Sequence, residues 1–309
     1  MAPVFTGNWF NFGRNPSAAG PAGALQISGG TKTTHGSYTV HTFLGPGTLT
    51  VTGGSGASLP SVAFLLVAGG GGGGTGNSNE GAGGGGGGGV VKQPGYTIAG
   101  PGTYAITVGD GGAHAPDSGS VGEDGEDTTF VASPTLTYTA KGGGVGKFLT
   151  GADGGSGGGG GGASQENPGG SATQPTQSNP GASNYGSAGG MRIHMSPSTQ
   201  TGAGNGAGGG GAGGAGADGT TRNGGPGITS CTPAPLGGPG ISIDYRTGSG
   251  ATYAAGGEGG AGFDTNCPNV SKTANTGDGG DGSNPNSPSA TPGASGICVF
   301  RFPNTVYNG

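Results

Sequence analysis

The sequence predicts an all-β protein in which short antiparallel strands, arranged like a sandwich, are combined with a glycine-rich polyproline-II bundle. Glycine makes up 86 of the 309 residues, and residues 83–89 are an unbroken glycine run, which a helix does not tolerate because glycine costs extra entropy to order. The apolar residues form short runs without helical periodicity. Charged residues are only 8% of the chain, so it lacks the self-repulsion typical of disordered proteins.

The apolar runs predict the strands in order. Residues 37–43 favour a strand, residues 45–47 (Gly-Pro-Gly) supply a turn, and residues 48–52 alternate polar and apolar, so we expect a hairpin. Residues 62–67 are continuously apolar, as in a strand that is covered on both faces. Further strands are expected at residues 103–108, 128–132, 136–140 and 297–302.

Glycine, alanine, serine, asparagine and proline dominate residues 142–295. Polyproline II has three residues per turn, so a glycine at every third position leaves one edge bare and lets neighbouring backbones approach closely. This spacing is kept by Gly210, Gly213, Gly216 and Gly219, which predicts segments joined by backbone hydrogen bonds. Collagen is excluded because the glycine runs break a strict Gly-X-Y period.

The composition divides the chain into four parts: an aromatic arm (1–35), a strand-rich part (36–141), a polyproline-II and loop region (142–295), and a closing strand with a tail (296–309). Aromatic side chains anchor many protein interfaces, so the arm is predicted to dock to a partner. The alternative is that its aromatics cap the edge of the local sheet. These aromatics are Phe5, Trp9, Phe10 and Phe12.

Four motifs follow one another along the chain: residues 38–43 (YTVHTF), 62–72 (VAFLLVAGGGG), 104–112 (YAITVGDGG) and 293–302 (GASGICVFRF). In this order they resemble the glycine-rich domain found in tail-fibre and other virion proteins of tailed bacteriophages. The resemblance covers residues 36–302. It departs at Cys298 and Phe302, where the family ending usually has an aliphatic residue and a tyrosine.

The resemblance implies a non-enzymatic, oligomeric virion protein exposed on the particle, foremost a fibre or adhesin that acts in host attachment. Its partners would be other virion proteins and a host-surface receptor, either protein or glycan. Assembly in the host cytoplasm and release by lysis agree with a start that lacks a signal-peptide pattern. Two alternatives stay open: a decoration (cement) protein without receptor binding, and an extracellular matrix or ice-binding protein, for which residues 48–52 provide one Thr-X-Thr row.

Isolated apolar and aromatic residues in the glycine-rich region are the candidate receptor contacts, since aromatics are frequent at interfaces. The alternative is that they fill gaps between the bundle and the sheet. The candidates are Tyr185, Met191, Ile193, Met195, Tyr245, Tyr253 and Phe263.

No residue pattern predicts catalysis or a cofactor. Residues 142–148 look like part of a phosphate-binding loop, but the first required glycine would fall at Lys141 and Phe148 replaces the required Ser or Thr. The four histidines are dispersed along the chain. With 10 Lys and Arg against 15 Asp and Glu there is no basic stripe for nucleic acid. No stretch approaches the roughly 20 apolar residues of a membrane span.

Carboxylates and cysteines leave two points open. An acidic stretch is either a calcium site or a solvated loop, and its members are Asp110, Asp117, Glu123, Asp124, Glu126 and Asp127. Cys298 alternates with Phe300 and Phe302, so it is predicted to face the core. Cys231 and Cys267 either form a disulfide after lysis or stay reduced, as thiols do in cytoplasm.

Overall fold

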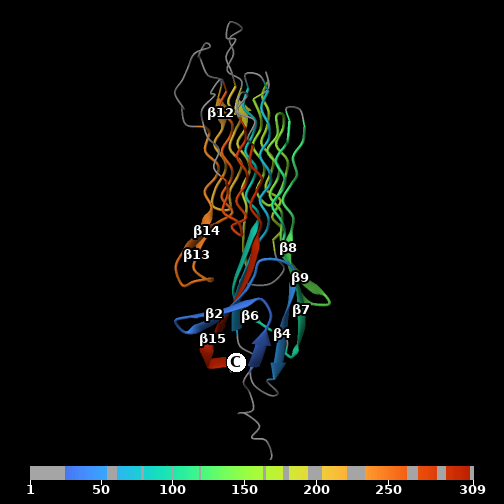
Figure 1. Ribbon diagram of the computed structural model, residues 1–309, viewed down its shortest axis with the longest axis vertical. Helices are drawn as coiled ribbons and strands as arrows, with labels where there is room; N and C mark the ends of the chain where they lie inside the picture. Colours follow the sequence, from blue (N-terminus) through green and yellow to red (C-terminus); the bar gives the residue numbers. More distant parts are fainter. Residues whose placement is uncertain are drawn as a thin grey trace, which may run out of the picture.

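The computed structural model is an elongated molecule, with paired strands at one end and a bundle of extended segments at the other (Figure 1). The regular elements of the described residues are strands, apart from a short 3-10 helix at Asn304–Val306, which confirms the all-β prediction. The structure describes residues 25–53, 61–77, 80–98, 100–117, 120–162, 165–176, 181–193, 204–220, 234–262, 271–283 and 290–306.

Two sheets form a sandwich. The five-stranded sheet has the order β1 (Leu25–Ser28), β4 (Gly47–Gly53), β7 (Gly102–Thr107), β8 (Thr128–Ser133) and β9 (Leu136–Ala140). The six-stranded sheet has the order β10 (Ser183–Tyr185), β6 (Val90–Thr97), β5 (Ser61–Val67), β15 (Ile297–Pro303), β3 (Tyr38–Phe43) and β2 (Thr31–His35). All neighbours within these two sheets are antiparallel.

An aromatic core joins the two sheets. Phe64 of β5 and Phe300 of β15 point at Phe130 of β8 and Tyr138 of β9, with ring centroids 4.8 Å apart for Phe64–Tyr138 and 4.9 Å for Phe130–Phe300. The rings meet mostly edge to face, the arrangement that aromatic quadrupoles favour. Cys298 is fully buried in the same cluster, as predicted.

The other face of the six-stranded sheet is also covered. Leu65 and Val299 pack there against Ile243 and Tyr253, which belong to a small hairpin of β13 (Ile241–Ile243) and β14 (Ala251–Tyr253). Residues 62–67 are therefore buried on both faces, as their continuous apolar pattern predicted.

The predicted hairpin of residues 37–52 does not form. Residues 44–46 do make a connection, but it crosses from β3 in the six-stranded sheet to β4 in the five-stranded sheet. β3 pairs instead with β2 and with β15, from the other end of the chain. The non-local partner prevails because β15 buries apolar side chains on both of its faces. Residues 25–35, which we assigned to the terminal arm, already form β1 and β2.

The strands continue into the glycine-rich bundle, whose segments bond with a period of three residues. Successive amides of residues 69–74 donate in turn to three neighbouring segments, so each segment accepts a hydrogen bond from every third residue. Gly71 and Gly74, for example, donate to Gly86 and Gly83. Three residues per turn is the period of polyproline II, so the hydrogen bonds support that assignment, which stays a prediction. The bundle also includes residues 68–76 and 81–89, outside the region 142–295.

One predicted segment is interrupted. The chain reverses at residues 211–214, where Gly211 and Gly214 bond to each other in both directions. Gly210 and Gly216 therefore lie on two antiparallel segments rather than on one continuous helix, and the regular glycine spacing runs through a turn. Beyond the turn the period of three is restored, because Gly208 bonds to Ala217.

Candidate functional site

The far end of the bundle, opposite the sandwich, is the candidate contact site (Figure 1). Described residues from several segments of the bundle are hydrogen-bonded to one another there. The carbonyl of Gly204 accepts the amide of Gly81, and that of Thr220 accepts the amide of Asn205. β11 (Arg192–Ile193) and β12 (Gly219–Thr220) pair in parallel at the same level. Segments far apart in sequence are thus fixed side by side at this end.

Buried polar side chains hold the far end together. Arg192 is only 1% exposed, and its Nη1 donates to the carbonyl of Gln165 at 3.4 Å. Burial lowers the pKa of Arg192, while nearby Glu80 opposes this shift. Asn167 exchanges two backbone hydrogen bonds with Arg192, and the carboxamide oxygen of Asn205 accepts the amide of Gly262 at 2.8 Å. The described residues of the far end therefore form one hydrogen-bonded platform.

Two candidate contact residues flank Arg192 on this platform. Met191 is 38% exposed, and its amide donates to Asp218 at 2.8 Å. Ile193 is half-buried. Met191 is thus the predicted contact residue with the most accessible side chain among those that the structure describes.

The three tyrosines of the prediction lie elsewhere, at the base of the bundle. Tyr245 and Tyr253 are buried, so they are not exposed contacts, and the gap-filling alternative holds for both. The guanidinium carbon of Arg301 lies 4.1 Å from the ring centroid of Tyr245 and 4.4 Å from that of Tyr38. This cation–π stack clamps the β13–β14 hairpin onto the six-stranded sheet. Tyr185 is half-buried beside the same cluster.

The remaining predicted site residues lie outside the described part of the chain. They are the four aromatics of the arm, Phe5, Trp9, Phe10 and Phe12, and two candidate contacts, Met195 and Phe263. Cys231 and Cys267 also lie outside it, so their pairing stays open.

Two carboxylates of the acidic stretch accept hydrogen bonds from backbone amides of the bundle. Asp124 accepts the amide of Val145 and Asp127 accepts that of Gly142, both at 2.8 Å. Asp278 and Asp281 make the same kind of contact on another segment, where they accept hydrogen bonds from the amides of Ala255 and Glu258. Within the described residues, no group of three or more His, Cys, Asp or Glu side chains is arranged to hold a metal ion.

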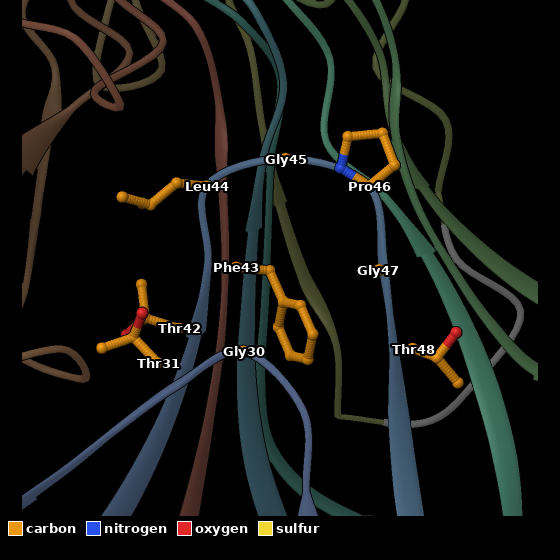
Figure 2. Close-up of a pocket in the computed structure, with 9 residues that line it drawn as sticks. All are labelled: Gly30, Thr31, Thr42, Phe43, Leu44, Gly45, Pro46, Gly47 and Thr48. Carbon is orange, nitrogen blue, oxygen red and sulfur yellow. The ribbon is translucent and has the colours of Figure 1, made fainter.

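A pocket of about 290 Å³ lies where the chain crosses between the two sheets (Figure 2). β2–β3 and β1–β4 pair on either side of the crossing, so Gly30 faces an arch formed by Leu44, Gly45 and Pro46. Figure 2 shows the side chains of Thr31, Thr42 and Thr48 spread to opposite sides of the arch rather than converging on one point. The pocket therefore does not gather polar groups for binding or chemistry.

Sequence reasoning missed the buried polar residues of the bundle. One signal was available: Asp124 and Asp127, like Asp278 and Asp281, are three residues apart, which matches the period of the bundle. Arg192 offered no comparable signal, because its burial depends on segments that meet only in the fold.

Residues 44–303 match a family model described as a glycine-rich domain. A comparison with curated proteins gives no match. Within the described residues, no helix has the length and apolar character needed to cross a membrane.

Proposed function

Because the chain belongs to the glycine-rich domain family, we propose that it is a non-enzymatic structural protein of a tailed-bacteriophage particle and that it acts in host attachment. The ordered motifs in residues 36–302 support the phage assignment through their resemblance to tail-fibre and other virion proteins. The protein would be part of the virion, assembled in the host cytoplasm and extracellular after lysis.

The opposite placement of two ends carries the proposal. The β4 arrow in Figure 1 points away from the bundle, and the last residue of β4, Gly53, pairs with Leu25, which follows the aromatic residues of the arm. β15, whose last residue is Pro303, ends at the same end. The far end of the bundle points the other way, and it holds β12 and its partner β11, which Met191 precedes. A protein of this polarity docks to the particle through the sandwich end and presents the far end to the host.

The construction of the bundle suits this role. Most of its segments are joined by backbone hydrogen bonds between glycine-rich stretches, so the connections at the far end can vary while the scaffold stays fixed. The partners we propose are other virion proteins at the sandwich end and a host-surface protein or glycan at the far end.

Binding to host cells tests the proposal. The purified full chain should bind susceptible cells and compete with phage adsorption, and a resistant strain of the same host is the control. Protein that incorporates into particles but neither binds cells nor competes would contradict the attachment role. Decoration without receptor binding would then be the function.

A further inference from the structure

The outer face of the five-stranded sheet is lined by threonine. Its inner face carries the core, so alternate residues of each strand point outward. On β4 these are Thr48, Thr50 and Thr52, the single row that the sequence predicted. The structure sets further rows beside it, because β1, β7, β8 and β9 show the same alternation of buried and outward residues.

Cross-strand registers align these rows. Thr50 pairs with Ser28 of β1 on one side and with Thr103 of β7 on the other. Nearer the bundle, Thr129 of β8 pairs with both Thr107 and Thr139. Each of these rows spans three strands, and together the two rows cover all five.

No charged side chain points outward from these five described strands. The remaining outward positions include Gln26, Ala105 and Val131, in a chain with 25 acidic and basic residues in total (10 + 15). Asp127 and Lys141, which form an ion pair of 3.2 Å, stand just beyond the ends of β8 and β9 beside the bundle. The face is thus neutral, with charge at its rim.

We infer that this face, the threonine face, is a self-association surface that packs against the threonine face of a second copy of the chain. Each copy carries a net charge of −5, so two copies repel each other on approach. The neutral threonine face is where they can approach without opposing like charges. A sheet face packed on the same face of a second copy makes an isologous contact, the kind found in two-fold dimers.

The size and stiffness of the face fit such a contact. Five strands about 4.8 Å apart and about 20 Å long give a footprint of roughly 500 Å² per copy, or about 1,000 Å² in total, the lower limit of specific interfaces. Threonine and valine are stiff at χ1, so little side-chain entropy is lost when they are buried. The expected complex is a reversible dimer whose population depends on concentration.

Analytical ultracentrifugation of the full chain over a wide range of protein concentration tests the inference. Wild type should shift from monomer to dimer as the concentration rises. Ala105→Glu places a charge at the middle of the central strand β7 and should raise the dissociation constant at least about tenfold, because two like charges would face a dry contact. Thr33→Glu, at an exposed position of β2 outside the threonine face, is the matched control and should leave the dimer unchanged.

Circular dichroism and the melting temperature establish that both variants are folded. If Ala105→Glu unfolds, Thr50→Lys makes the same test on β4. A wild type that stays monomeric at all concentrations would overturn the inference, as would a folded Ala105→Glu that associates like wild type. A monomeric wild type that inhibits ice recrystallisation, with the loss of that activity in Ala105→Glu, would assign the face to ice and overturn self-association.

Discussion

The amide of Gly71 donates to the carbonyl oxygen of Gly86 across 2.9 Å, and neither residue has room for a side chain. A Cβ at Gly71 would overlap the carbonyl oxygen of Gly144, and one at Gly86 would overlap that of Ser156. The obstacles are backbone atoms held by further hydrogen bonds, so they cannot rotate away as a side chain could. Glycine is therefore a packing requirement in the bundle.

Gly86→Ala should lower the free energy of unfolding by about 1–3 kcal/mol, since overpacking displaces backbone on several segments at once. Urea or thermal denaturation measures the change. The matched control is Gly45→Ala, because a Cβ there meets nothing within 4 Å. If Gly86→Ala is as stable as this control, the close approach in the bundle does not limit stability.

Asp278 is expected to stabilise the bundle as a hydrogen-bond acceptor and to destabilise it as a charge. Burial is the main cause that raises the pKa of Asp278, while the amide of Ala255, which donates to it at 2.9 Å, lowers it. A raised pKa means that the folded state holds the proton more tightly, so ionisation costs stability at neutral pH and this cost disappears as the pH falls.

Asp278→Asn should therefore be at least as stable as wild type at pH 7, with the two converging in acid. Asp278→Ala leaves the amide of Ala255 without its acceptor and should cost about 1–3 kcal/mol. Denaturation of the three proteins at neutral and acid pH gives the comparison. If Asp278→Asn is as unstable as Asp278→Ala at pH 7, the negative charge itself is stabilising.

The strands that local sequence patterns predicted are present in the structure. The errors arose where strand pairing or burial depends on segments that are distant in sequence. The apolar run of residues 62–67 predicted a strand covered on both faces, because each of these residues is apolar and successive residues of a strand face opposite sides. The expected partner of β3 was wrong because the choice depended on β15, more than 200 residues away. Tyr245 looked like an exposed contact for the same reason, since Arg301 and Tyr38 enclose it only in the fold.

The candidate site was predictable in outline only. The sequence placed Met191 and Ile193 among the contacts, and the structure sets both at the far end. Nothing in the sequence indicates that Arg192 between them is buried, because its surroundings are backbone carbonyls and glycines from other segments.

His41 should make the sandwich sensitive to mild acid. It is 1% exposed, and its Nδ1 lies 2.7 Å from the carbonyl oxygen of Gly29, to which it donates. Burial lowers the pKa of His41 and nearby Lys32 adds to the effect, although the bond to Gly29 opposes it. The unfolded chain then binds the proton more readily, so stability is full above the ordinary histidine pKa of about 6.5 and falls as the pH drops below it.

His41→Gln removes this titration, so the free energy of unfolding should fall less between pH 7.5 and pH 5.5 in the variant than in wild type. Urea denaturation at both pH values measures the two differences. Equal losses in the two proteins would show that His41 is not the group responsible.

Arg192→Ala should loosen the far end without unfolding the sandwich. The variant would lose the hydrogen bond from the guanidinium to the carbonyl of Gln165, and a hydrogen bond from a charged donor contributes about 1.5–3 kcal/mol. Hydrogen exchange should accelerate at the amides of Asn167 and Asn205 and stay unchanged at Leu65. Arg246→Ala, at a partly exposed position near the base of the bundle, is the control. Uniform acceleration over both regions would mean that the bundle and the sandwich open together.

The two ends of the molecule should be separable in function. Deleting residues 1–24 leaves β1 intact and should give a folded protein that no longer incorporates into particles, because it removes Trp9 and Phe12 with the rest of the aromatic arm. Met191→Glu alters the exposed side chain of the far end and should weaken binding to host cells severalfold while incorporation continues. Leu44→Glu, at an exposed position where the chain crosses between the two sheets, is its control. Quantitative blotting of purified particles measures incorporation, and adsorption of labelled protein to cells measures binding. If the deletion abolishes cell binding but leaves incorporation intact, the proposed polarity is reversed, with the sandwich end facing the host.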